Sequence, residues 1–108
     1  MLYAWDELNI DHIFKHRVAP VEAEYVVDHA NSPWPEQRGD NKFLVWGPTE
    51  TGRMLQVIFV LKPPEEIAFE SLSIDDWADL GEMDRIIYVV HAMELTPEMK
   101  RLFRKRRR

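Results

Sequence analysis

The chain has 108 residues, of which 45% are hydrophobic and none is cysteine. This length suits one domain with one core, and the lack of cysteine excludes a disulfide framework and a thiolate metal site. The N-terminus carries no basic region followed by an apolar run, and no apolar run reaches the roughly 20 residues that span a bilayer. We therefore expect a single-domain cytoplasmic protein that has no membrane partner.

The formal charge is divided unevenly along the chain. Residues 100–108 hold seven of the fourteen Lys and Arg residues. Residues 1–99 hold seven basic residues against all nineteen acidic ones, a net charge of −12. Such asymmetry is typical of a chain that binds an anionic partner, clamps its own unlike ends together, or self-associates through them.

The N-terminal part predicts a short strand at 2–5 and a first helix at 6–16. Ile10, Ile13 and Phe14 recur at helical spacing within that helix. Residues with this spacing form one stripe along a helix, so all three are expected to face the core.

The middle of the chain predicts a helix, a loop and a hairpin. The helix is expected at 19–30, where Pro20 is pre-set for the first turn. Residues 31–41 hold two prolines and a glycine and therefore predict a loop. The segments 42–48 and 53–61 are apolar and β-branched and are separated by a short turn sequence, which predicts a central hairpin.

The last part predicts a third long strand at 85–93 and a closing helix at 96–108, with Thr96 as its N-cap. The residues of this helix that are expected to face the core are Met99, Leu102 and Phe103. The stretch 63–84 holds eight acidic residues and no basic one, and it exceeds an ordinary hairpin loop. It is interpreted as an inserted excursion with one helical turn capped by Ser73.

Together these elements predict an α+β domain over residues 1–108. The expected order is β-α-α-β-β-β-α, with one mainly antiparallel four-stranded sheet and helices packed on it.

Four stretches of the chain resemble the BrnT family of small ribonuclease toxins, which share a RelE-like fold. They are WDELNIDHIFKHRV (5–18), VEAEYVVDHANSP (21–33), KFLVWGPTETGRMLQVIFV (42–60) and DRIIYVVHAMELTPEMKRLF (84–103). The resemblance implies a toxin component of a toxin–antitoxin pair, acting as an endoribonuclease that needs no metal or other cofactor. It also implies an antitoxin protein and RNA as partners.

The resemblance and the local chemistry together predict the site residues. The candidate catalytic residues are His91, Lys15, His16 and Glu98. The candidate RNA-binding residues are Arg53, Lys62, Lys100, Arg101 and Arg104. His91 ends the last strand and has a side chain suited to proton transfer. The strand-end arginine of the family pattern falls on Met93, so part of the expected phosphate clamp is replaced.

Two further features have both a functional and a structural interpretation. His12 and His16 have a spacing that can hold zinc, but neither a metalloprotease glutamate nor a third ligand accompanies them, so no metal site is predicted. Trp34 lies between two prolines, where it either stacks on a base or fills a loop against the core.

The basic C-terminus leaves four interpretations open: it binds RNA phosphates, meets an acidic antitoxin segment, folds back on the excursion at 63–84, or is merely solvated. The alternative to an enzyme is a non-catalytic protein- or nucleic-acid-binding module of the same fold. A homo-oligomer is compatible with either.

Overall fold

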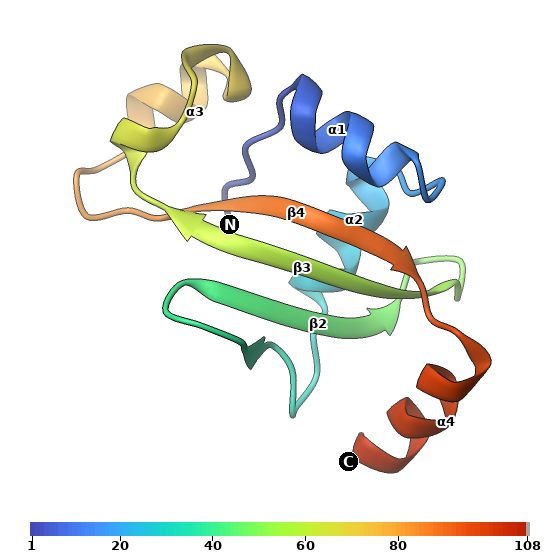
Figure 1. Ribbon diagram of the computed structural model, residues 1–108. Helices are drawn as coiled ribbons and strands as arrows, with labels where there is room; N and C mark the ends of the chain where they lie inside the picture. Colours follow the sequence, from blue (N-terminus) through green and yellow to red (C-terminus); the bar gives the residue numbers. More distant parts are fainter. Residues whose placement is uncertain (108) are drawn as a thin grey trace.

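Four antiparallel strands in the order β1-β2-β3-β4 form the centre of the structure, a computed structural model that describes residues 1–107 (Figure 1). The strands are β1 (Glu36–Gln37), β2 (Lys42–Pro48), β3 (Met54–Lys62) and β4 (Ile86–Glu94). The α-helices are α1 (Glu7–Phe14), α2 (Pro20–Asp28), α3 (Ile74–Asp79) and α4 (Pro97–Arg106). Two 3-10 turns, η1 (Pro64–Glu66) and η2 (Phe69–Ser71), lie between β3 and α3. The predicted α+β class with an antiparallel four-stranded sheet is confirmed.

The predicted hairpin and the third long strand are confirmed. β2 and β3 pair antiparallel with Val45 opposite Val57, and Gly52 supplies a positive φ of 90° in the turn between them. β4 pairs with the other side of β3, and Ala92 lies opposite Val57. Because all three of these partners are fully buried, the register is fixed by burial of one face of the sheet.

The sheet has a covered face and an open face. Cross-strand partners point to the same side of a sheet, so Val45, Val57 and Ala92 share the covered face, where α2 packs. The open face carries Trp46, Gln56, Ile58, His91 and Met93 by the same alternation. A bulge beside the Ile58–Phe59 pair leaves one extra residue in β4, and this shift keeps His91 on the open face.

The predicted strand at 2–5 and the predicted element order are corrected. Tyr3 forms only an isolated parallel bridge with Ile87, in which the Ala4 amide donates to the Ile87 carbonyl at 3.0 Å. The fourth strand is instead β1, inside the segment predicted as a loop. The element order is therefore α1-α2-β1-β2-β3-α3-β4-α4. A two-residue edge strand that follows two prolines leaves no periodic signal in the sequence.

The predicted apolar stripe of α1 is wrong for two of its three residues. Ile13 is fully buried, whereas Ile10 and Phe14 are 38% and 73% exposed. Figure 1 shows α1 beside β4 at the edge of the sheet, while α2 lies behind the sheet. Because α1 meets the domain along an edge, only a narrow line of the helix reaches the core.

Helix α4 leaves the end of β4 and lies to one side of the sheet (Figure 1). Thr96 caps it as predicted, since its hydroxyl accepts the Met99 amide at 3.2 Å. Met99 and Phe103 pack against the core, but Leu102 is 45% exposed, so the prediction that Leu102 faces the core is wrong. The contact of α4 with the domain therefore depends on one side of the helix, mainly on Phe103.

The excursion at 63–84 builds a small second core. Ala4, Ile67, Leu72 and Ile86 form it, and Ser73 caps α3 as predicted by accepting the Asp76 amide.

Figure 1 shows α3 and α4 at opposite ends of the domain, so the described residues form no clamp between the excursion and the basic helix. Arg108, the last residue of the predicted basic tail, lies outside the described residues. Within residues 1–107, no helix has the length and apolar character needed to cross a membrane.

Candidate functional site

Three histidines meet at the edge of the open face. The His91 ring on β4 lies 6.1 Å from the His12 ring and 5.4 Å from the His16 ring, measured between ring centroids. His12 is in the last turn of α1, and His16 is in the turn that directly follows the helix. We call these three residues the histidine cluster. The structure thus brings together two of the predicted catalytic residues, His16 and His91, and adds His12.

The histidine cluster favours a neutral His91. Partial burial lowers the pKa of His91 below its ordinary value, and the neighbouring His16 and His12 lower it further, because a positive charge on either one opposes a second. A neutral imidazole has one nitrogen that can accept a proton. At neutral pH, His91 is therefore suited to act as a proton acceptor.

Within residues 1–107, the side chains of the other two predicted catalytic residues form no hydrogen bond or ion pair with the cluster. Lys15 is the C-cap of α1 and is exposed, where a cation also complements the helix dipole. Glu98 is exposed in the first turn of α4. In the part of the chain that the structure describes, no group of three or more His, Asp or Glu side chains is arranged to hold a metal ion.

Arg53 connects three parts of the fold. Its guanidinium pairs with Glu94 at 2.9 Å and with Glu22 at 3.1 Å, and it donates to the backbone carbonyl of Arg17 at 2.7 Å. The backbone of Arg17 has the left-handed conformation, with a φ of 59°, and a hydrogen bond to its carbonyl helps to hold that turn. The predicted role of Arg53 in RNA binding remains a prediction, but its guanidinium already has several partners within the fold.

Lys62 lies at the opposite end of β3. Its ammonium group lies 4.1 Å from the centroid of the Tyr88 ring, a cation–π contact. The Tyr88 hydroxyl donates to the carboxylate of Asp6 at 3.0 Å, and burial and this hydrogen bond raise the pKa of Tyr88 to about 12. Lys62 is nine residue steps of extended chain beyond Arg53, roughly 30 Å, so the two side chains cannot hold the same phosphate.

The cations of α4 lie beside an aromatic cluster. Lys100, Arg101 and Arg104 are exposed on the helix, and their role in RNA binding remains a prediction. Next to them, Phe103 stacks on Trp34 with ring centroids 5.1 Å apart. Trp34 is 4% exposed, which fits the prediction that it fills a loop against the core rather than offering a free face to a base.

Arg106 holds this aromatic cluster together. Its guanidinium lies 5.2 Å from the centroid of the Trp34 ring and 5.6 Å from that of Trp46, and it pairs with Glu36 of β1. The hydrogen bond from Arg106 lowers the pKa of Glu36. The roles of His12, Trp46, Arg106 and Glu36 could not be predicted from the sequence, because each depends on a partner that is distant along the chain. Only the i, i+4 spacing of His12 and His16 gave a signal.

Comparisons with protein-family models, curated proteins and solved structures find no match to this chain.

We predict that Arg53→Met lowers the free energy of unfolding by about 2 kcal/mol, because methionine keeps the aliphatic stem but loses the ion pairs and the hydrogen bond to the Arg17 carbonyl. Urea unfolding measures the change. Lys105→Met is the control, since Lys105 is exposed on α4. A loss no larger than that of the control would show that the Arg53 contacts contribute little to stability.

We also predict that His91 makes the folded state sensitive to acid. The pKa of His91 is lower in the folded state than its ordinary 6.5, so below that pH the unfolded chain binds more protons than the folded chain. The contribution of neutral His91 to stability is therefore complete above about pH 6.5 and is lost as the pH falls towards the folded-state pKa. His91→Gln should lose less stability than the natural chain between pH 7.5 and 5.5 in urea unfolding. Equal losses would contradict the lowered pKa.

Proposed function

We propose that this chain is a BrnT-like toxin component that acts in the cytoplasm and cleaves single-stranded RNA at the histidine cluster without a metal ion. The observation that carries the proposal is the meeting of His12 and His16 with His91 on the open face of the sheet. RNA cleavage requires a proton acceptor and a proton donor. In the cluster, neutral His91 is the acceptor and the ring of a neighbouring histidine is the donor.

The chemistry assigned to the cluster has two proton transfers. His91 accepts the proton of a ribose 2′-hydroxyl, and the 2′-oxygen attacks the adjacent phosphorus to form a 2′,3′-cyclic phosphate. The bond from phosphorus to the 5′-oxygen breaks, and a proton passes from the His16 ring to that oxygen. His91 and His16 lie close enough to act on one phosphodiester, since their ring centroids are 5.4 Å apart.

In this proposal, the basic helix α4 binds the phosphates of the RNA. Met93 stands where the family pattern has an arginine, so the strand itself places no cation two residues beyond His91. Helix α4 begins three residues after β4 and exposes Lys100 and Arg101. In this proposal, these two cations hold the RNA backbone and the histidine cluster supplies the proton transfers.

The second candidate function is RNA binding without cleavage. Met93 favours it, because a cluster without an adjacent arginine stabilises the charge of the transition state less well. An antitoxin that covers the open face is compatible with either function. The two candidates share the RNA-binding surface and differ only in whether the histidine cluster is active.

We predict that the purified chain cleaves mixed-sequence single-stranded RNA to products with 2′,3′-cyclic phosphate ends, and that EDTA leaves the rate unchanged. His91→Gln should lower the rate by about 100-fold or more, because it removes the proton acceptor. Asp79→Asn, which replaces a titratable group on α3 by its amide, is the control. The melting temperature of each variant shows whether it is folded.

Binding without cleavage would identify the second candidate. Loss of cleavage in EDTA, or full activity of His91→Gln, would contradict a metal-independent histidine mechanism.

A further inference from the structure

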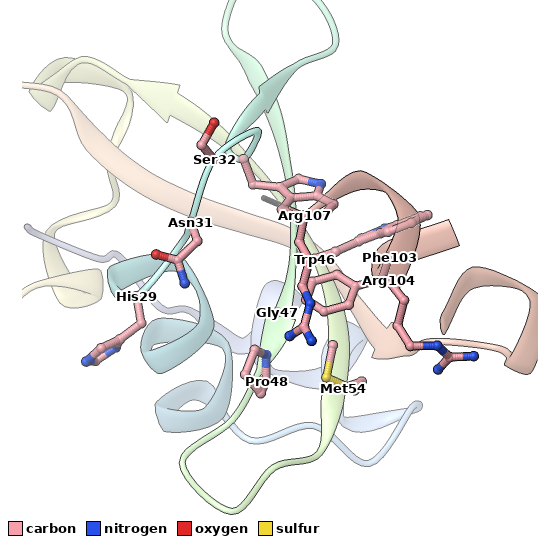
Figure 2. Close-up of a pocket in the computed structure, with 11 residues that line it drawn as sticks. His29, Asn31, Ser32, Trp46, Gly47, Pro48, Met54, Phe103, Arg104 and Arg107 are labelled. Carbon is pink, nitrogen blue, oxygen red and sulfur yellow. The ribbon is translucent and has the colours of Figure 1, made fainter. Parts of the chain in front are cut away.

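A groove of about 820 Å³ lies beside the aromatic cluster, between α4, the end of β2 and the loop that follows α2 (Figure 2). We call it the α4 groove. Trp34, Trp46 and Phe103 form one wall, Arg104 and Arg107 lie at its rim, and Asn31 is on the side of the loop. The chain has nineteen acidic residues, yet none of them lines this groove. The groove therefore combines apolar surface with unopposed positive charge.

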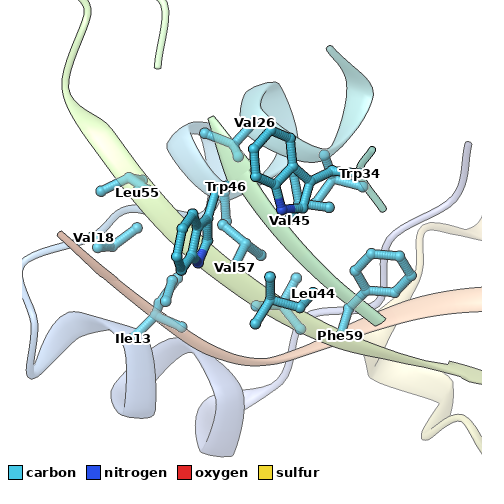
Figure 3. Close-up of a cluster of buried hydrophobic side chains, with 14 of the residues drawn as sticks. Ile13, Val18, Val26, Trp34, Leu44, Val45, Trp46, Leu55, Val57 and Phe59 are labelled. Carbon is cyan, nitrogen blue, oxygen red and sulfur yellow. The ribbon is translucent and has the colours of Figure 1, made fainter. Parts of the chain in front are cut away.

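The aromatic wall is preformed. Trp34 and Phe103 stack with an angle of 19° between their planes, and the Arg106 guanidinium, paired with Glu36, lies over both tryptophan rings. Figure 3 shows Trp34 and Trp46 among the buried side chains of the main core. A ligand in the groove thus meets stacked rings that are already in place, which favours affinity, and a shift of the Trp34 indole exposes its buried N–H to that ligand.

The arginines at the end of α4 differ in whether they already have an acidic partner. Arg106 is engaged with Glu36 and with the tryptophans. Arg104 and Arg107 form no ion pair among residues 1–107, and Arg107 lies against the Phe103 ring at 5.6 Å. Two guanidinium groups at one rim are suited to a phosphate, which accepts paired hydrogen bonds from arginine.

The indole nitrogen of Trp34 is an independent indication of a ligand. Trp34 lines the groove and is 4% exposed, and its Nε1 donor has no acceptor among the described residues. Buried donors in folded proteins nearly always have an acceptor, and leaving one unpaired is costly. A ligand that carries oxygen or nitrogen acceptors beside an aromatic ring meets this requirement.

We infer that the α4 groove binds one nucleoside phosphate unit. The phosphate accepts hydrogen bonds from Arg104 and Arg107, and the base lies against Phe103 and Met54. An acceptor of the nucleotide receives the Trp34 N–H, and Asn31 offers both a donor and an acceptor to the sugar or the base edge. The aromatic and arginine surface favours a nucleotide over an acidic peptide, which has no ring to place against the wall.

This inference rests on the proposed function, in which the nucleotide belongs to an RNA strand. Trp46, Gln56 and Met93 form one row across the open face, and His91 lies two residues before Met93 on the same face. By strand spacing and rise, the Trp46 position on β2 lies roughly 12 Å from the His91 position on β4. One short RNA segment can therefore occupy the α4 groove and reach the histidine cluster.

Titration with AMP, CMP, GMP and UMP, followed by isothermal calorimetry, tests the groove on the full chain. Arg104→Ala/Arg107→Ala should weaken nucleotide binding at least 10-fold. Lys42→Ala/Lys105→Ala removes the same charge outside the groove and should change it little. Trp34→Phe keeps a ring and loses the donor, so it should weaken binding by about 3- to 10-fold. The melting temperatures of the variants show that they are folded.

Several results would overturn the inference: inorganic phosphate binding as tightly as the nucleotides, equal weakening by the two double variants, or preference for a poly-glutamate peptide. Failure of the inference is distinguishable from failure of the proposed function. If RNA is cleaved but no nucleotide binds in the groove, the inference fails and the function stands. If nucleotides bind with the predicted variant pattern but RNA is neither bound nor cleaved, the function fails and the groove stands.

Discussion

The register of the three long strands is the constraint on which the rest of the structure depends. It places Val45, Val57 and Ala92 together beneath α2 and thereby assigns every second residue to the opposite face. A shift of one residue in β4 would bury a charged or polar group and expose Ala92, so the buried core fixes which side chains remain on the open face. The location of His91 is therefore a consequence of core packing, and the bulge in β4 adjusts it locally.

Two arginines then fix the elements that flank the open face. Arg53 joins the hairpin turn, the end of β4 and the turn after α1, which keeps His12 and His16 beside β4. Arg106 joins α4 to β1 and to the tryptophans. The positive charge of this acidic protein is thus divided between arginines that stabilise the fold and exposed cations of α4 that remain available to an anionic partner. This division explains why net charge alone says little about function here.

Much of the fold could be predicted because its signals are local. The apolar, β-branched runs of β2, β3 and β4 and the caps Thr96 and Ser73 are each visible within a few residues. What failed depends on distant partners. Ile10 and Phe14 have the spacing of a buried stripe, but the edge position of α1 leaves them exposed. The spacing of His12 and His16 was visible as well, but its relation to His91 follows only from the packing of α1 beside β4. The same reason hid the engagement of Arg53, since neither of its acidic partners is near it in sequence.

We infer that the open face, from the histidine cluster to α4, is the surface that meets RNA. The most direct test is a nuclear magnetic resonance titration of the isotope-labelled chain with a short 2′-O-methyl RNA, which lacks the hydroxyl needed for cleavage. The account predicts the largest amide shift changes at 90–93, at Gln56 and along α4, with little change at 63–84. Largest changes in the acidic excursion or on α2, or none at any RNA concentration, would contradict it.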